Sequence, residues 1–451
     1  MTVRTLMATA VLAIVATACS SGSTATPGAS AAATAAPPAT QSANASETSS
    51  SAAAPSAASS AGAGSLSPAE AWAADLDQLD RAVRSTHPLP WVNRPESEWV
   101  ARIAQLKTSL PTMSRNDAVV AVMGLVALLD THSGVAGEDN GFHFYGLVPY
   151  WFADGMYVVA AQDPSLVGSR IDAIGTTPID AVIAKLTPYV NADNESALHD
   201  GLPVLASVPE VLHALGIVPD ESKPDYQLTT PGGKTVTADP APLTTDDYVA
   251  AIPSVVNGPL EGSKPEAVSR RGEPIWSERI PQTNDFYIAY NATGTDATST
   301  IAAMRAALDT KSINRVILDL RYARGGNASK AADLIEALVG DKRINRPGGL
   351  AILIGRESIS ATTALASMLE QQSEAFFVGE PTPARPNTLL GADPITLEHS
   401  GIVVYITGTL DPIAGPSDTR TAIRPKVAVA LTAADFFVGK DPALDAAIKA
   451  P

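Results

Sequence analysis

The sequence is short of cysteine, of basic charge and of long apolar segments. One cysteine occurs in 451 residues, which excludes a disulfide framework and any zinc site built from cysteine thiolates. Lys and Arg number 31 against 47 Asp and Glu, a formal charge of -16. Because phosphate neutralisation needs a local surplus of Lys and Arg, this balance argues against a nucleic-acid partner. Stability must come from a large buried core.

The first 18 residues have the features of an export signal. One positive charge, Arg4, precedes an apolar stretch from Leu6 to Ala16 that is too short for a stable membrane span. The cysteine, Cys19, follows directly, and residues 15–19 resemble a bacterial lipobox. The resemblance implies lipid modification of Cys19 and attachment to the extracytoplasmic face of a membrane in the bacterial cell envelope. Plain secretion after ordinary signal cleavage is the alternative.

The rest of the chain divides by composition into a tether and a folded body. Residues 19–65 consist almost entirely of Ala, Ser, Thr, Pro and Gly, which predicts a disordered tether. The remainder exceeds the usual size of a single core. We expect a helical subdomain at 66–133, a mixed α/β module at 134–245, a Pro/Gly/Ser-rich connector at 246–283 and an α/β domain at 284–451.

The last region alternates regularly between apolar β-like runs and helical segments. Strands are expected at 286–290, 316–320, 350–354 and 376–378, and helices at 297–308, 328–338 and 361–371. Strand, helix and strand at this spacing predict βαβ units with parallel pairing, and therefore an α/β fold class.

Two of these strand ends carry candidate chemistry. The strand at 316–320 runs into Gly325 and Gly326, which expose backbone N–H groups ahead of a helix. The strand at 350–354 runs into Ser360 at a helix start, where a nucleophile gains from the helix dipole and neighbouring N–H donors can bind an oxyanion. Serine is also a favoured N-cap, so spacing alone leaves a purely structural role open for Ser360.

Several motifs in this order resemble the tail-specific, or tricorn-like, C-terminal processing serine peptidases. They lie at residues 316–321, 325–327, 355–361, 378–382 and 420–427. The resemblance implies a crotonase-like α/β catalytic domain, and a weaker similarity at 167–175 implies a PDZ-like middle module. It also implies a peptide or protein substrate, with Ser360 as nucleophile and the N–H groups of Ala361 and of Gly325 or Gly326 as oxyanion donors.

The candidate general base is assigned from a position at which this sequence departs from the family pattern. In the Ser-Lys branch of the family a lysine falls at the position of Arg385, and a glutamate at that of Thr363. An arginine is not deprotonated in proteins and cannot act as a base. The tricorn-like branch instead uses an upstream histidine after a hydroxyl residue, which His132 after Thr131 matches. Imidazole can take the serine proton and return it to the leaving amine.

The third catalytic member stays open at this point. The family's acidic residue precedes a late proline and corresponds to Asp418, with Glu380 and Asp130 as competitors. The other histidines do not pair with carboxylates at a metal-site spacing, and phosphate-loop and dinucleotide fingerprints are missing, so no metal or cofactor is expected. Besides an exported serine peptidase, the sequence allows a catalytically silent peptide-binding homologue or an ester hydrolase using the same serine.

Overall fold

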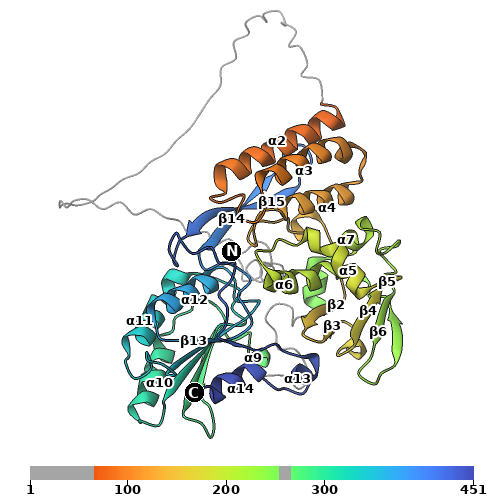
Figure 1. Ribbon diagram of the computed structural model, residues 1–451. Coiled ribbons are helices and arrows are strands. Elements are labelled where there is room, and N and C mark those ends of the chain that lie inside the picture. The colour runs from red at the N-terminus through yellow and green to blue at the C-terminus, as the bar shows by residue number, and fades with distance from the viewer. Residues whose placement is uncertain (1–65, 253–265) are drawn as a thin grey trace, which may run out of the picture.

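The computed structural model describes residues 66–252 and 266–451. The expected export signal, Cys19 and the tether lie outside these residues. Within them no helix has the length and apolar character needed to cross a membrane. The body contains three groups of elements: amino-terminal helices, an antiparallel sheet with its own helices, and a mostly parallel sheet (Figure 1).

The amino-terminal helices are α2 (Pro68–Thr86), α3 (Glu96–Ser109) and α4 (Arg115–Val126). Ser67 starts α2 through a capping box with Glu70, and the Ser114 side chain accepts the Asp117 N–H at the start of α4. Residues 118–126 of α4 are all buried, which matches a twelve-residue apolar helix inside the protein rather than in a membrane. The Asp130–His132 segment therefore begins shortly after the buried end of α4.

The middle module is built on an antiparallel sheet with the strand order β2-β3-β4-β6-β7. The strands of this module are β1 (Phe144–Tyr145), β2 (Leu147–Phe152), β3 (Gly155–Ala161), β4 (Arg170–Ile174), β5 (Thr177–Pro178), β6 (Tyr226–Thr229), β7 (Thr235–Ala238) and β8 (Pro242–Leu243). Its helices are α5 (Ile179–Leu186), α6 (Glu195–Leu205), α7 (Pro209–Ala214) and α8 (Thr245–Ala251). The expected mixture of α and β elements is confirmed.

The last region forms a sheet with the order β16-β13-β12-β11-β10-β9, in which every neighbouring pair except β9 with β10 is parallel. Its strands are β9 (Ile275–Arg279), β10 (Asp285–Tyr290), β11 (Arg315–Asp319), β12 (Leu350–Ile354), β13 (Phe376–Gly379) and β16 (Val427–Ala428). Its helices are α9 (Glu266–Ser269), α10 (Thr298–Asp309), α11 (Ala332–Gly340), α12 (Ala361–Gln372), α13 (Ala433–Phe437) and α14 (Pro442–Lys449). The predicted βαβ units are confirmed.

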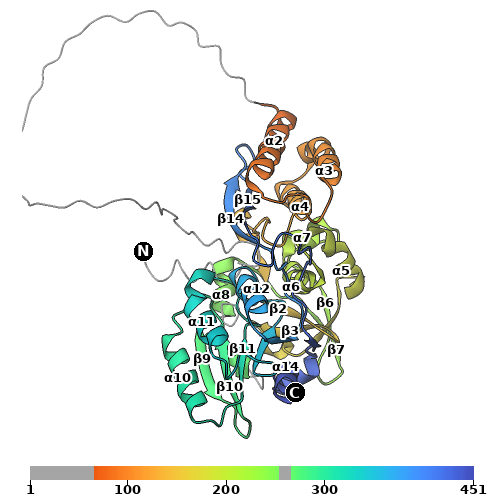
Figure 2. The same ribbon diagram turned by 60° about the vertical axis from the view of Figure 1, so that its left-hand side comes forward.

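Alternate residues of these strands face two separate cores. Leu318 and Ile352 pack with α10, α11 and α12, whereas Ile317 and Leu353 pack with α14 on the opposite face. The helices flank the sheet in Figure 2. Because both faces are covered, the strands are apolar throughout, as expected for parallel strands.

Two expected boundaries are wrong. Residues 275–279, assigned to a connector, form β9 at the sheet edge, where Trp276 is buried against Tyr287. The hairpin of β14 (Thr388–Thr396) and β15 (Val403–Asp411) leaves the last domain, and its Val404 and Ile406 join the core of the amino-terminal helices. The contact of this hairpin with the amino-terminal helices joins segments far apart in the sequence, which no local pattern predicts.

Short 3-10 helices complete the described elements. They are η2 (Leu110–Thr112), η3 (Glu138–Asn140), η4 (Pro164–Leu166), η5 (Thr187–Tyr189) and η7 (Ala328–Ala331).

Candidate active site

Ser360 occupies a strained turn between β12 and α12. Its backbone has φ 59° and ψ -128°, a conformation that costs a non-glycine residue about 1–3 kcal/mol and is typical of functional sites. It stands at the N-cap position of α12, yet its side chain makes no capping hydrogen bond. The Ser360 hydroxyl therefore does not act as a helix cap, which was the structural role that the sequence left open, and its oxygen remains available at the helix N-terminus.

The turn around Ser360 is held by other hydroxyl groups. The Ser358 hydroxyl donates to the Leu320 carbonyl at 2.8 Å and accepts the Gly355 N–H at 3.0 Å. The Thr363 hydroxyl donates to the Ser358 carbonyl at 2.6 Å. These bonds tie the loop after β12 to the end of the neighbouring strand β11.

The Gly325–Gly326 turn follows β11 and lies beside Ser360. Gly325 has φ 105°, and a Cβ atom on it would lie 3.0 Å from Ser360 Cβ and 3.5 Å from Ser360 Oγ. Gly326 has φ 136°, and a Cβ there would lie 1.9 Å from the Thr293 carbonyl oxygen. Both positions require glycine, the first for the approach to the serine and the second for packing on Thr293.

Of the predicted oxyanion donors, Gly325 and Ala361 have suitable backbone groups. Among the hydrogen bonds of the described residues, none has the N–H of Gly325 or of Ala361 as its donor. Gly325 instead accepts the Thr293 N–H through its carbonyl oxygen at 3.2 Å. A tetrahedral oxyanion is stabilised by two backbone N–H donors close to the nucleophile, and the N–H groups of Gly325 and Ala361 are the candidates for this role.

His132 follows the buried Asp130, which fixes its backbone rather than its ring. Asp130 Oδ1 accepts the His132 N–H at 2.7 Å, and Oδ2 contacts His87 Nε2 at 2.6 Å and accepts the Ser133 hydroxyl at 2.7 Å. Burial raises the pKa of Asp130, but the His87 hydrogen bond and charge, with the further contacts of the carboxylate, lower it to about 2. Asp130 is therefore ionised and already fully engaged.

The imidazole of His132 has no hydrogen-bond partner among the described residues, although both ring nitrogens are buried. Burial lowers the pKa of His132 below its ordinary value, and the charges of Asp130 and Asp193 oppose this shift. The ring is neutral near pH 7 and keeps a nitrogen lone pair for a proton. Both properties suit a general base.

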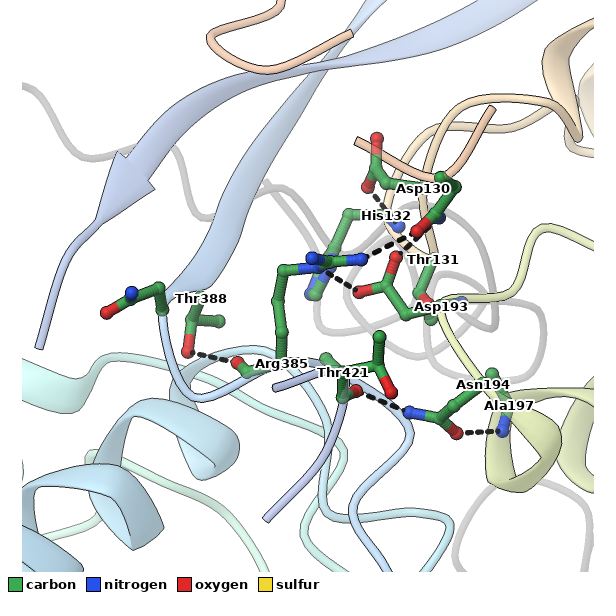
Figure 3. Close-up of polar contacts among 12 residues, drawn as sticks. Asp130, Thr131, His132, Asp193, Asn194, Ala197, Arg385, Thr388 and Thr421 are labelled. Carbon is green, nitrogen blue, oxygen red and sulfur yellow. Dashed lines mark hydrogen bonds and ion pairs between the residues drawn. The ribbon is translucent and has the colours of Figure 1, made fainter. Parts of the chain in front are cut away.

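Asp193 and Arg385 surround the His132 segment and were missed as site residues by the sequence reasoning (Figure 3). Arg385 Nε pairs with Asp193 Oδ2 at 3.2 Å, and Asn93 Nδ2 donates to Asp193 Oδ1 at 2.8 Å. The Thr131 hydroxyl accepts the Asp193 N–H at 2.8 Å and donates to the Pro383 carbonyl at 3.2 Å. The one available signal was the arginine at the family's lysine position, which here neutralises a buried carboxylate.

One cavity of about 70 Å³ lies beside the loops that carry the two predicted catalytic residues. Thr131 and Ile359, the chain neighbours of His132 and Ser360, line it together with Pro383. The rest of its wall is mostly apolar: Met123, Val135, Phe142, Phe144, Val204, Leu205, Val208 and Val211. A mostly apolar cavity beside the loops of the candidate nucleophile and the candidate base is suited to a substrate side chain.

The expected acidic third member does not contact the imidazole. Both carboxylate oxygens of Asp418 pair with Arg420, which also pairs with Glu370 on α12. Glu380 forms a two-pronged ion pair with Arg356 at 2.8 Å for each contact. Since the His132 ring lacks a hydrogen-bond partner in the described chain, the ring-orienting role expected of Asp418, Glu380 or Asp130 is not realised in this structure. Asp418 and Glu380 are instead paired with arginines, and Asp130 is paired with His87.

No group of three or more His, Cys, Asp or Glu side chains with the geometry of a metal site occurs at 66–252 or 266–451.

Comparisons with known proteins concern one segment of the last region and the fold. Residues 285–347, from β10 through the Gly325–Gly326 turn and α11, match the model of peptidase family S41; Ser360 and His132 lie outside the matched segment. No curated protein matches the chain. Among solved structures, a mutant of CPAF is 13% identical and superimposes with a TM-score of 0.57, covering 85% of this chain and 97% of its own. Mature CPAF is 12% identical with a TM-score of 0.55 and the same coverage.

The CPAF similarity extends across all three groups of elements, which shows a shared α/β fold. The family match includes β11 and the turn that carries one candidate oxyanion donor, Gly325. Residues 285–347 are therefore similar to peptidase family S41, and the described chain as a whole shares its fold with CPAF.

Proposed function

We propose that this protein is an exported, membrane-tethered serine peptidase that cleaves peptides or the carboxyl-terminal tails of proteins. The observation that carries the proposal is the state of Ser360: its hydroxyl makes no capping bond, its backbone is strained, and Gly325 approaches it closely. A serine used only as a helix cap needs none of these features.

The chemistry follows from the groups around Ser360. The serine oxygen attacks the peptide carbonyl carbon while His132 takes the hydroxyl proton, and the resulting oxyanion accepts hydrogen bonds from Gly325 and Ala361 N–H. His132 then gives the proton to the departing amine, which leaves an ester between Ser360 and the substrate acyl group. Water, deprotonated by the same imidazole, hydrolyses this ester and restores the serine.

Substitution of Ser360 tests the proposal directly. We expect Ser360→Ala to abolish peptide cleavage and labelling by a fluorophosphonate probe. Ser373→Ala, at the other end of α12, is the matched control because that hydroxyl donates to the Leu369 carbonyl and accepts the Ala375 N–H, both local contacts. Cleavage by Ser360→Ala at the wild-type rate refutes the assignment.

A second candidate is a peptide-binding homologue without activity. It is favoured by the imidazole that lacks an orienting acid in the described chain. The two candidates differ in one readout: an inactive homologue binds peptides but gives no covalent adduct with the fluorophosphonate.

The membrane tether rests on Cys19 and its lipobox-like context. We expect the wild-type protein to partition with membranes of a bacterial host and Cys19→Ala to appear in the soluble fraction. Identical partitioning of the two proteins would remove the lipid anchor from the proposal.

A further inference from the structure

Arg324 immediately precedes the Gly325–Gly326 turn and joins carboxylates from two other parts of the fold. Its two terminal nitrogens donate to the two oxygens of Asp200 at 3.0 and 2.7 Å, and its Nε donates to Glu357 Oε2 at 3.0 Å. Asp200 belongs to α6 in the middle module, and Glu357 lies in the loop that leads to Ser360. One guanidinium therefore links the oxyanion loop, the nucleophile loop and α6.

This cluster is shielded from solvent. The side chains of Asp200 and Glu357 are 9% and 10% exposed. Burial raises the pKa of Asp200, and Arg324 opposes the shift by favouring the ionised carboxylate. A planar guanidinium bonded to a carboxylate through two nitrogens fixes direction as well as distance, which a lysine ammonium does not.

The two catalytic loops are joined at two levels. At the strand ends, the Ser358 hydroxyl bonds the Leu320 carbonyl. Further along, the Arg324–Glu357 pair is the one ion pair of the described residues that connects the loop after β11 to the loop after β12. Oxyanion donors work only within a few tenths of an ångström of their ideal distance. The relative placement of these loops therefore decides how well Gly325 N–H serves Ser360.

We propose that Arg324 is a positioning residue for catalysis, which holds the Gly325 N–H in place beside Ser360 by binding Asp200 and Glu357 together. The inference rests on the proposed peptidase function and deepens it. Because Asp200 also lines the apolar cavity, the same ion cluster connects the wall of the substrate pocket with the oxyanion hole.

The test compares Arg324→Met and Arg324→Lys with wild type in steady-state peptide cleavage. We expect Arg324→Met to lower kcat by about tenfold to a hundredfold with KM nearly unchanged, because the lost interaction acts in the transition state. Affinity for a peptide boronate, which forms a tetrahedral adduct with the serine, falls by the same factor, while affinity for the amino-terminal product peptide is unchanged. We expect the kcat and the boronate affinity of Arg324→Lys to lie between those of wild type and Arg324→Met.

Two further variants separate positioning from general stability. Arg343→Met is the matched control, because Arg343 also bridges two carboxylates, those of Asp309 and Asp341, on the surface; we expect wild-type kcat. The triple variant Arg324→Met, Asp200→Asn and Glu357→Gln leaves no unpaired charge in the cluster, so it folds even where Arg324→Met does not. Its kcat remains as low as expected for Arg324→Met.

Wild-type kcat in the triple variant, or a loss confined to KM, overturns the positioning role. An equal loss of boronate and product-peptide affinity overturns it as well, because it indicates a general disturbance of the pocket. A wild-type protein that neither cleaves peptides nor reacts with fluorophosphonate overturns the proposed function and this inference together, whereas an active wild type confines any failure to Arg324.

Discussion

Replacing Gly325 by alanine tests the oxyanion arrangement most directly. The added Cβ would lie 3.0 Å from Ser360 Cβ, closer than ordinary van der Waals contact, and the backbone φ of 105° disfavours any side chain. The variant must shift the turn, the serine or both. Loss of one oxyanion donor costs about a hundredfold to a thousandfold in kcat, or about 2.7–4 kcal/mol.

The assay is kcat for a peptide substrate, measured together with thermal unfolding. Gly391→Ala is the matched control, because Gly391 also has a positive φ, 60°, but nothing lies within 4 Å of its would-be Cβ. Its backbone strain costs about 1–2 kcal/mol of stability without touching the site. We expect Gly391→Ala to lower the unfolding temperature and keep kcat, and Gly325→Ala to lose activity even where it is folded. Gly325→Ala with kcat within threefold of wild type refutes the placement of the oxyanion hole.

Three other outcomes follow from the environment of His132 and from the cavity. The folded-state pKa of Asp130 is about 2 against an ordinary 3.8, which gives about 2 kcal/mol of stability that is present above pH 4 and is lost as the pH falls towards 2. In urea unfolding, wild type should therefore lose this stability between pH 4 and pH 2, whereas Asp130→Asn should not. The same pH dependence in both proteins refutes the reasoning. Because the Asp193 charge raises the pKa of His132 against the effect of burial, Asp193→Asn should move the acidic limb of the kcat/KM profile to lower pH, and a move to higher pH contradicts the assignment. Val208→Phe narrows the apolar cavity and should lower kcat/KM for peptides with Phe before the cleaved bond about tenfold relative to Ala; an unchanged ratio places the substrate side chain elsewhere.

The elements that sequence reasoning predicted best have strong local signals. The parallel strands are continuous apolar runs separated by amphipathic helices, and Ser114 starts α4 as a capping residue. Strand β9 was missed because the Pro, Gly and Ser residues around it suggested a connector, although it forms a local antiparallel hairpin with β10. The β14–β15 hairpin was placed in the wrong part of the fold because the amino-terminal helices on which it packs lie far away in the sequence.

Apolar periodicity and turn residues were enough to predict the α/β class and a serine at the helix start after a buried strand, because both are properties of short segments. The roles given to Ser360 and Arg385 came from the resemblance of their motifs to a known family. Only the tertiary structure decided that Arg385 neutralises Asp193, that Asp418 is engaged by Arg420, and that Arg324 links two catalytic loops to α6. Which charges pair depends on distances between segments that are far apart in the chain, and burial then makes each pairing costly to break.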